Sequence, residues 1–502
     1  MYLSTDSLSL TFLLLSPLIG IVLIALTPKD LAHWVRKIAI ACSTITLLYA
    51  SNFYAVFEFN ALRQFQENYP WSENLDNAFH FALDGFSLPM VLLATLLSWI
   101  AIIVSNRIHA KLYYQLLLVL ETAMIGVFIT QDWSLFYVFW EATLIPLFFL
   151  IDGWGGKKRQ KASLNFVLYT MGGSIFMLIS LLVAFDLVGM HSFDFIVIKE
   201  GMKELDESQQ ILIFLGLLIG FGVKMPIFPL HGWLSLAHVE APSPVSILLS
   251  GILLKMGAYG IVRAVEMLPK AAIALQTLLF VLAVISIVYG ALLAWQQSDL
   301  KRMIAYSSVS HMGVVLLGIS SLTEMSILGA SLQMVAHGLS AGALFMLIGL
   351  LYERTHTRNI NDYGSLIHLT PKFAFFITMI LVASVGFPGT IGFVAELHIL
   401  VGSFPTWQWW MLLLGIGILV TAVYSLRTAK HLFTGPMKAS MQHVEDLSPL
   451  EMLAASVLLA AILYFGFYPV PLIELMAANV KEFSEHISLY AHSQQRVNLI
   501  TL

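Results

Sequence analysis

Five ionisable side chains stand inside long apolar segments of the chain: Glu121, Glu141, Lys224, Lys255 and Glu396. A charged group in the hydrocarbon core of a membrane costs at least about 2.5–3.5 kcal/mol, so such groups commonly mark ion or proton pathways. Carboxylates and amines can both hold and release a proton. These residues therefore predict proton transfer through a membrane, and buried structural ion pairs are the alternative interpretation.

The sequence predicts that Glu141 and Lys224 are partners, because neither has a central residue of opposite charge in its own segment. Paired across neighbouring helices, both groups stay charged, and a modest separation would release or capture a proton. Lys255 has small neighbours such as Gly257 that let helices approach closely, and it is predicted to relay protons to the second half of the chain. Glu396 is predicted to hold the proton near its exit.

Histidines occupy positions between these charges. His311 and His337 lie in the middle of apolar segments, and His231 and His238 lie beside an interruption of another segment. An imidazole can pass a proton between its two nitrogens near neutral pH. His311 and His337 are therefore assigned to proton transfer, and His231, His238 and Glu121 are auxiliary candidates. A packed core residue is the alternative for each of these histidines, and a packing partner within the bundle is the alternative for Glu121.

Metal and cofactor sites are not predicted. No pair of histidines stands at helical ligand spacing beside a third ligand, so a metal centre has no support. The only cysteine is Cys42, which alone cannot hold an iron–sulfur cluster. No glycine-rich phosphate-binding fingerprint follows a strand, so no nucleotide cofactor is expected in this chain.

Two of the apolar segments carry helix breakers. One reads GFGVKMPIFPLHGW, with Pro226 and Pro229, and the other reads SVGFPGTIGFVAELHIL, with Pro388 and Gly389. Proline removes a hydrogen-bond donor and clashes with the preceding turn, so both helices should break inside the membrane. Irregular backbone at that depth must face protein or a water-filled cavity, which is typical of transporters. Ordinary proline kinks in packed helices are the alternative.

The composition requires a membrane environment. Of the 502 residues, 58% are hydrophobic and only 11% are charged, whereas soluble domains carry roughly 25% charged residues. A soluble enzyme, a nucleic-acid-binding protein and a disordered regulator are excluded. The predicted fold is an all-α polytopic membrane protein.

Since a span needs about 20 apolar residues, the sequence predicts about fourteen, near 8–26, 37–58, 82–103, 112–130, 133–151, 162–188, 209–229, 245–266, 270–294, 303–320, 327–351, 373–399, 410–432 and 450–475. They form one membrane domain, 1–502. The two interrupted helices lie five spans apart, which predicts two inverted five-helix repeats. The parts are the N-terminal helices 1–111, the first repeat 112–266, the inverted repeat 270–432, and a C-terminal helix and tail 433–502.

Lys and Arg are concentrated in alternate loops, for example Lys157, Lys158 and Arg159, which predicts the cytoplasmic side. Lys301 and Arg302 are assigned to such a cytoplasmic loop. Both termini are then predicted on the opposite side of the membrane.

Several long strings resemble one known family. FWEATLIP, GFGVKMPIFPLHGWL, GILLKMGAYG, SDLKRMIAYSSVSHMG, QMVAHGLSAGALF and FPGTIGFVAEL are similar to the antiporter-like M subunits of bacterial NADH:quinone oxidoreductase (respiratory complex I), in the Mrp-type antiporter superfamily. The resemblance extends from about residue 80 to 475. It implies a fold of fourteen helices with two inverted units, and proton translocation driven by quinone reduction elsewhere in the complex.

The resemblance also implies roles for individual residues. Glu141 and Lys224 match the ion pair of the fifth and seventh helices, Lys255 matches the lysine of the eighth, and Glu396 matches the carboxylate of the twelfth. His311 and His337 match histidines that continue the same axis. NADH, FMN, iron–sulfur clusters and quinone are then expected in partner subunits, and the other membrane subunits, including the sister antiporter-like subunits, are the expected partners in the bacterial inner membrane.

Two neighbouring segments depart from the family pattern, and in the second, APSPVS, Pro244 stands where an Ala-Gly pair is more usual. WLSLAH, with Ser235 and Leu236, stands where the family usually reads Trp-Leu-Pro-Asp-Ala-His. A subunit of a cation/proton antiporter, or of a membrane-bound hydrogenase or carbon-uptake complex, is therefore the alternative to complex I.

Overall fold

The computed structural model describes residues 9–500, except 73–76, 107, 190–191, 437, 439–440 and 442. Most of the described chain is helical, as the composition predicts. Twelve helical stretches in these residues are long and apolar enough to cross a membrane, and Leu10–Leu26 and Pro371–Ser384 are shorter apolar helices. The protein is an all-α polytopic membrane protein with one small hairpin.

The first half of the chain forms α1 (Leu10–Leu26), η2 (Lys29–Trp34), α2 (Val35–Ala55), β1 (Gln64–Ser72), β2 (Asn77–Leu83), α3 (Ser87–Val104), α4 (Lys111–Ile129), α5 (Trp133–Ala142), α6 (Leu144–Trp154), α7 (Arg159–Val188), α8 (Phe195–Gly201), α9 (Glu207–Lys224), α10 (Leu234–Glu240), α11 (Ser243–Leu248), the π-helical turn η3 (Leu249–Leu253) and α12 (Leu254–Met267).

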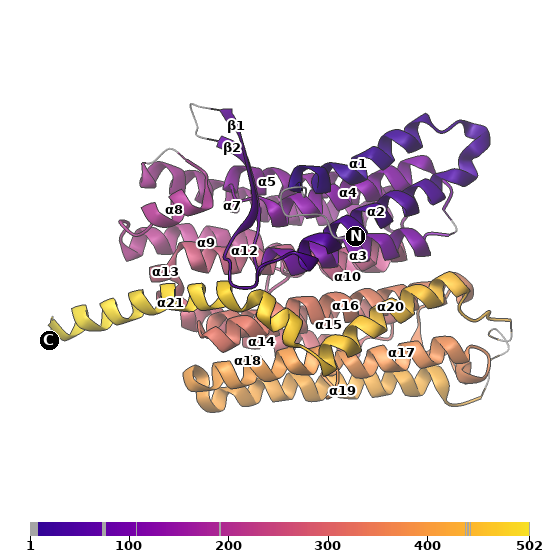
Figure 1. The fold of residues 1–502 in the computed structure, drawn as a ribbon. Coiled ribbons are helices and arrows are strands. Elements are labelled where there is room, and N and C mark those ends of the chain that lie inside the picture. The colour runs from indigo at the N-terminus through magenta and orange to yellow at the C-terminus, as the bar shows by residue number, and fades with distance from the viewer. Residues whose placement is uncertain are drawn as a thin grey trace.

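The second half forms α13 (Pro269–Ala274), α14 (Gln276–Gln296), α15 (Leu300–Ser320), α16 (Glu324–Thr355), η4 (Ile360–Asp362), η5 (Leu366–His368), α17 (Pro371–Ser384), α18 (Ile391–Trp407), η6 (Gln408–Met411), α19 (Leu412–Phe433), α20 (Pro449–Phe467) and α21 (Val470–Ile500). Figure 1 shows the two halves as adjoining layers of long helices, indigo to magenta above and orange to yellow below.

The helices at the boundary between the two layers form the most buried part of the protein. The stretch from α11 through α12 is buried along its whole length, and α15 and α16 are nearly so. α10 packs on α15, and α11 packs on α16. Charged side chains in the buried parts of these helices are therefore held away from lipid and water.

Both interruptions lie where the breakers stand in the sequence. α9 ends at Lys224, and the chain runs through turns that include Pro226 and Pro229 before α10 begins at Leu234. α17 ends at Ser384, and α18 begins at Ile391 after Pro388 and Gly389. The inverted relation of the two repeats and the sidedness of the termini stay predictions.

A β-hairpin replaces part of the loop predicted near 59–81. β1 and β2 pair antiparallel, and the hairpin projects from the bundle in Figure 1. His80 on β2 lies 2.6 Å, Nδ1 to Oδ2, from Asp194, which caps the N-terminus of α8. Burial disfavours the charge of Asp194, but bonds from His80 and from the amide of Ile196 outweigh it, so the pKa of Asp194 is lowered.

The C-terminal part of the chain contains one more long helix than the sequence predicts. The span predicted over 450–475 ends earlier, at Phe467, and a second helix, α21, follows at once. Figure 1 shows α21 along the boundary of the two layers, where it packs on α12, α13 and α16. Asn479 on α21 accepts a hydrogen bond from Gly85 and donates one to the carbonyl of Leu62. α21 is therefore hydrogen-bonded to the chain on both sides of the hairpin.

Candidate functional site

Lys255 lies in the most buried part of the protein. It lies on α12, directly after the π-helical turn η3, and its side chain is fully buried. Its ammonium donates to the carbonyl of Ser250 at 2.6 Å and lies 2.6 Å from Nδ1 of His337 on α16. A π-helical turn shifts the hydrogen-bond pattern by one residue, and such turns are frequent at functional sites. Here the carbonyl of Ser250 accepts a hydrogen bond from the side-chain ammonium of Lys255.

The hydrogen bonds continue from His337. Its Nε2 lies 3.1 Å from the hydroxyl of Ser308 on α15, which in turn lies 3.1 Å from the hydroxyl of Ser250. With the ammonium donating to Nδ1, the neutral ring carries its proton on Nε2 and donates it to Ser308. Both nitrogens of His337 are thus engaged, which is the arrangement that a proton relay requires.

His311 is the next titratable group toward the second half of the chain. Its ring centroid lies 5.3 Å from that of His337. On its other side a cavity of about 10 Å³ is lined by both His311 and Glu396. Such a volume is at the lower limit for one water molecule. We call Lys255, His337, His311 and Glu396 the central row.

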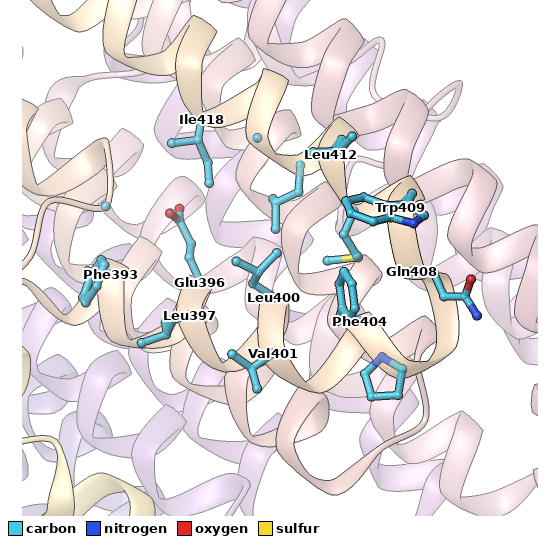
Figure 2. A pocket seen from close by; sticks show the side chains of 15 residues that line it. Phe393, Glu396, Leu397, Leu400, Val401, Phe404, Gln408, Trp409, Leu412 and Ile418 are labelled. Carbon is cyan, nitrogen blue, oxygen red and sulfur yellow. The ribbon is translucent and has the colours of Figure 1, made fainter.

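Glu396 lies on α18 shortly after the second interruption. A Cβ at Gly386 would lie 2.3 Å from Oε2 of Glu396, so glycine makes room for the carboxylate. Within the part of the chain that the structure describes, no hydrogen bond or ion pair is recorded for it. Figure 2 shows its side chain at one wall of an apolar groove of about 730 Å³ between α18 and α19.

Lys224 and Glu141 lie in the same region but do not touch directly. The Lys224 ammonium donates to the carbonyl of Trp140 at 3.2 Å and to the Thr143 hydroxyl at 3.0 Å. It also lies 3.9 Å from the centroid of the Trp140 ring, a cation–π contact. Glu141 interacts with Lys224 through its electric field, and one of its oxygens is buried without a hydrogen-bond partner.

A local interruption positions these groups. Pro146 has no N–H, so the carbonyl of Ala142 loses its usual helical donor, and the chain divides into α5 and α6 at Thr143. Thr143 therefore turns its hydroxyl toward Lys224. Glu141 faces a second surface groove, of about 670 Å³, lined mainly by apolar residues of α5, α6 and α7.

The auxiliary candidates are less connected. Glu121 on α4 is fully buried, and neither carboxylate oxygen has a hydrogen-bond partner in the described residues. It lies near Cys42, away from the central row. His231 packs against Tyr289, with ring centroids 5.4 Å apart. His238 is fully buried, and its ring stacks on Phe345.

Two buried cations escaped the sequence prediction. Lys301 was assigned to a loop but lies in the first turn of α15 and is only 2% exposed. Arg263 near the end of α12 pairs with Asp84 and with Glu266, which lies 3.1 Å away, and Lys199 binds Glu266 at 2.9 Å. Both cations stand near the ends of their apolar segments. Acidic residues near the ends of other segments were the available sign that these cations could be paired and buried. No group of three or more His, Cys, Asp or Glu side chains in the described residues could hold a metal ion.

Comparison with known proteins gives consistent matches. Residues 130–421 match the family described as NADH:quinone oxidoreductase/Mrp antiporter, TM. The NAD(P)H-quinone oxidoreductase chain 4 1 of a Picosynechococcus species is 40% identical, over 92% of this chain and 90% of that protein. A chain of respiratory complex I from Thermus thermophilus has a TM-score of 0.88 at 29% identity, over 95% of this chain and 99% of that one. A chain of an archaeal membrane-bound sulfane sulfur reductase, at 24% identity, covering 91% of this chain and 76% of that one, has a TM-score of 0.82 and shares the fold.

Proposed function

Because the chain belongs to the NADH:quinone oxidoreductase/Mrp antiporter family of membrane proteins, we propose that it is the antiporter-like membrane subunit of a respiratory NADH:quinone oxidoreductase and translocates protons. The observation that carries the translocation is the fully buried ammonium of Lys255, bound to His337 at the start of the central row. A purely structural role would not require a costly charge beside a proton acceptor in the membrane.

The chemistry follows from the geometry of the central row. A proton leaves the Nζ of Lys255 and bonds to Nδ1 of His337, while the proton on Nε2 passes to the hydroxyl of Ser308, which gives up its own proton in turn, so the ring returns to a neutral state. His311 accepts next, and a water in the small cavity carries the proton to the carboxylate of Glu396. Glu396 releases it toward the far side of the membrane.

Glu141 and Lys224 form the second proton-handling element. The Lys224 ammonium is held by neutral acceptors and the Trp140 ring, while one oxygen of the nearby Glu141 is buried without a hydrogen-bond partner among the described residues. Motion of Glu141 toward Lys224 would stabilise both charges, and motion away would favour transfer of a proton. A change of separation between the two groups is therefore the step that couples this site to the rest of the assembly.

The partners are the other membrane subunits of that complex, including the sister antiporter-like subunits. The grooves beside Glu141 and Glu396 lie at the surface of the chain and are mainly apolar, which suits helices of neighbouring membrane subunits. NADH, FMN, iron–sulfur clusters and quinone belong to partner subunits in this proposal. The location is the bacterial cytoplasmic membrane, with both termini on the periplasmic side.

Purification of the native assembly through an affinity tag on this chain tests the proposal. We expect NADH:quinone reductase activity with flavin and iron–sulfur absorption in the assembly, and none of these in the chain after it is separated. Recovery of the chain only with small membrane subunits, and without NADH oxidation, would contradict the proposal and favour a cation/proton antiporter.

A further inference from the structure

Charged side chains gather where the C-terminus of α10 meets the start of α15. The ammonium of Lys301 donates to the carbonyl of Ala241, the residue after α10, at 3.0 Å. The guanidinium of Arg358 donates to the carbonyl of Val239 and pairs with Asp299 at 3.2 Å. Asp299 and Arg358 are partly exposed, whereas Lys301 behind them is buried. A line of polar groups therefore leads inward from the surface.

His238 continues this line one turn earlier on α10. Neither of its ring nitrogens has a hydrogen-bond partner in the described part of the chain, although the side chain is fully buried. The ring lies flat on Phe345, with centroids 4.4 Å apart. The positive charges of Lys301 and of Lys255 both act on it. An imidazole without partners thus lies in the field of two buried lysines.

The surroundings of Lys301 explain how a cation persists there. A positive charge at the C-terminus of a helix is stabilised by the helix dipole. Asp299, Glu353 and Glu240 add favourable electrostatic interactions, and Arg358 opposes them. A neutral glutamine could cap the same carbonyl without the desolvation cost of an ammonium. A lysine, unlike an arginine, can also give up its proton.

We infer that Lys301 takes up protons for the central row and passes them to Lys255 through His238, an inference that rests on the proposed function. The N–H bond of Lys301 breaks as a new N–H bond forms on His238, which leaves the lysine neutral and the imidazole charged. The imidazole then releases a proton to a neutral Lys255 and returns to its neutral form. Water at the Asp299–Arg358 end restores the proton on Lys301.

The test uses the assembled complex in membrane vesicles, with proton pumping and NADH oxidation both measured. Lys301→Arg and Lys301→Gln each retain a donor for the carbonyl of Ala241, but neither side chain exchanges protons. Lys301→His restores an exchangeable proton. Arg302→Gln is the matched control, because Arg302 is the exposed neighbour in the same turn.

A positioned proton donor commonly contributes about 10²-fold or more to a rate, so we expect at least a tenfold loss of pumping in the Arg and Gln variants. The control variant should pump normally. Lys301→His should recover part of the pumping, with its pH dependence displaced to lower pH, because an imidazole holds its proton less tightly than an amine. A merely structural cap would not distinguish arginine from histidine in this way.

Normal pumping by Lys301→Arg would overturn the inference, since the side chain would then serve only as a fixed cap of α10. Lys255→Arg, measured in parallel, distinguishes failure of the uptake route from failure of the proposed function. Loss of pumping in Lys255→Arg with normal pumping in Lys301→Arg leaves the proposed function standing and removes this uptake route. Normal pumping in Lys255→Arg would instead contradict the proposed function itself.

Discussion

Gly386→Ala displaces a carboxylate of the central row without altering its chemistry. Gly386 has φ of +76°, a left-handed conformation that costs an alanine roughly 1–2 kcal/mol. The new methyl group would also lie 2.3 Å from Oε2 of Glu396. Ordinary contacts need about 3.5 Å, so the carboxylate must retreat by about 1 Å. Its position relative to the cavity that it shares with His311 would therefore change.

The expected effect is a loss of proton transfer with retained assembly. A strain of about 1–2 kcal/mol is the usual size of a single substitution, which a large complex tolerates. Misplacement of a reacting group by about 1 Å can lower a rate by about 10²-fold. We therefore expect proton pumping to fall by at least about tenfold in the Gly386→Ala complex.

The assay is the initial rate of NADH-driven acidification of inverted membrane vesicles, normalised to the amount of assembled complex. Gly415→Ala is the matched control, because Gly415 lines the same groove and a Cβ there meets no atom within 4 Å. Equal pumping by the two assembled variants would refute the reasoning, since the position of the Glu396 carboxylate would then be immaterial.

Three further predictions concern individual carboxylates. For Glu396, pumping should fall in the order wild type, then Asp or Lys, then Gln, because only Gln cannot exchange a proton; equal pumping by Gln and Asp in vesicles would make this glutamate structural. Glu141→Gln should abolish pumping but leave a complex of normal size on native gels, and normal pumping would contradict its role. The lowered pKa of Asp194 makes its stabilisation of the hairpin present above about pH 4, the usual value of the free side chain, and lost as the pH falls through the lower folded value. Hydrogen exchange should therefore show a less protected hairpin on acidification, whereas an already weakened Asp194→Asn hairpin should not respond in that range; identical behaviour of the two proteins would contradict the assignment.

The interrupted helices were predictable because their signals are local. Pro226 and Pro388 remove backbone donors wherever they stand, so the positions of the two interruptions follow from the sequence alone. The burial of Lys255 and His337 was also predictable, since each stands far from the end of an apolar segment. Their direct contact joins residues 82 positions apart in the chain, which local hydropathy does not encode.

Other features needed the tertiary structure. Lys301 and Arg263 stand near segment ends, where the boundary of a span is uncertain by a few residues, so a buried residue was assigned to a loop. Lys224 was expected to bind Glu141 directly, but at the junction of α5 and α6 it binds the carbonyl of Trp140 and the hydroxyl of Thr143 instead. The hairpin and α21 are not long apolar segments, so hydropathy alone does not predict them, although alternating residues in NAFHFAL are typical of a strand.

The number of protons pumped per NADH oxidised, in vesicles that carry the Lys255→Arg complex, tests the central claim most directly. Arginine preserves the positive charge but does not release its proton, whereas the mechanism requires release from Lys255 to His337. The account predicts a ratio well below that of the wild-type complex in an assembly of normal composition. A ratio equal to that of the wild type would show that Lys255 supplies only a fixed charge and that protons cross the membrane elsewhere.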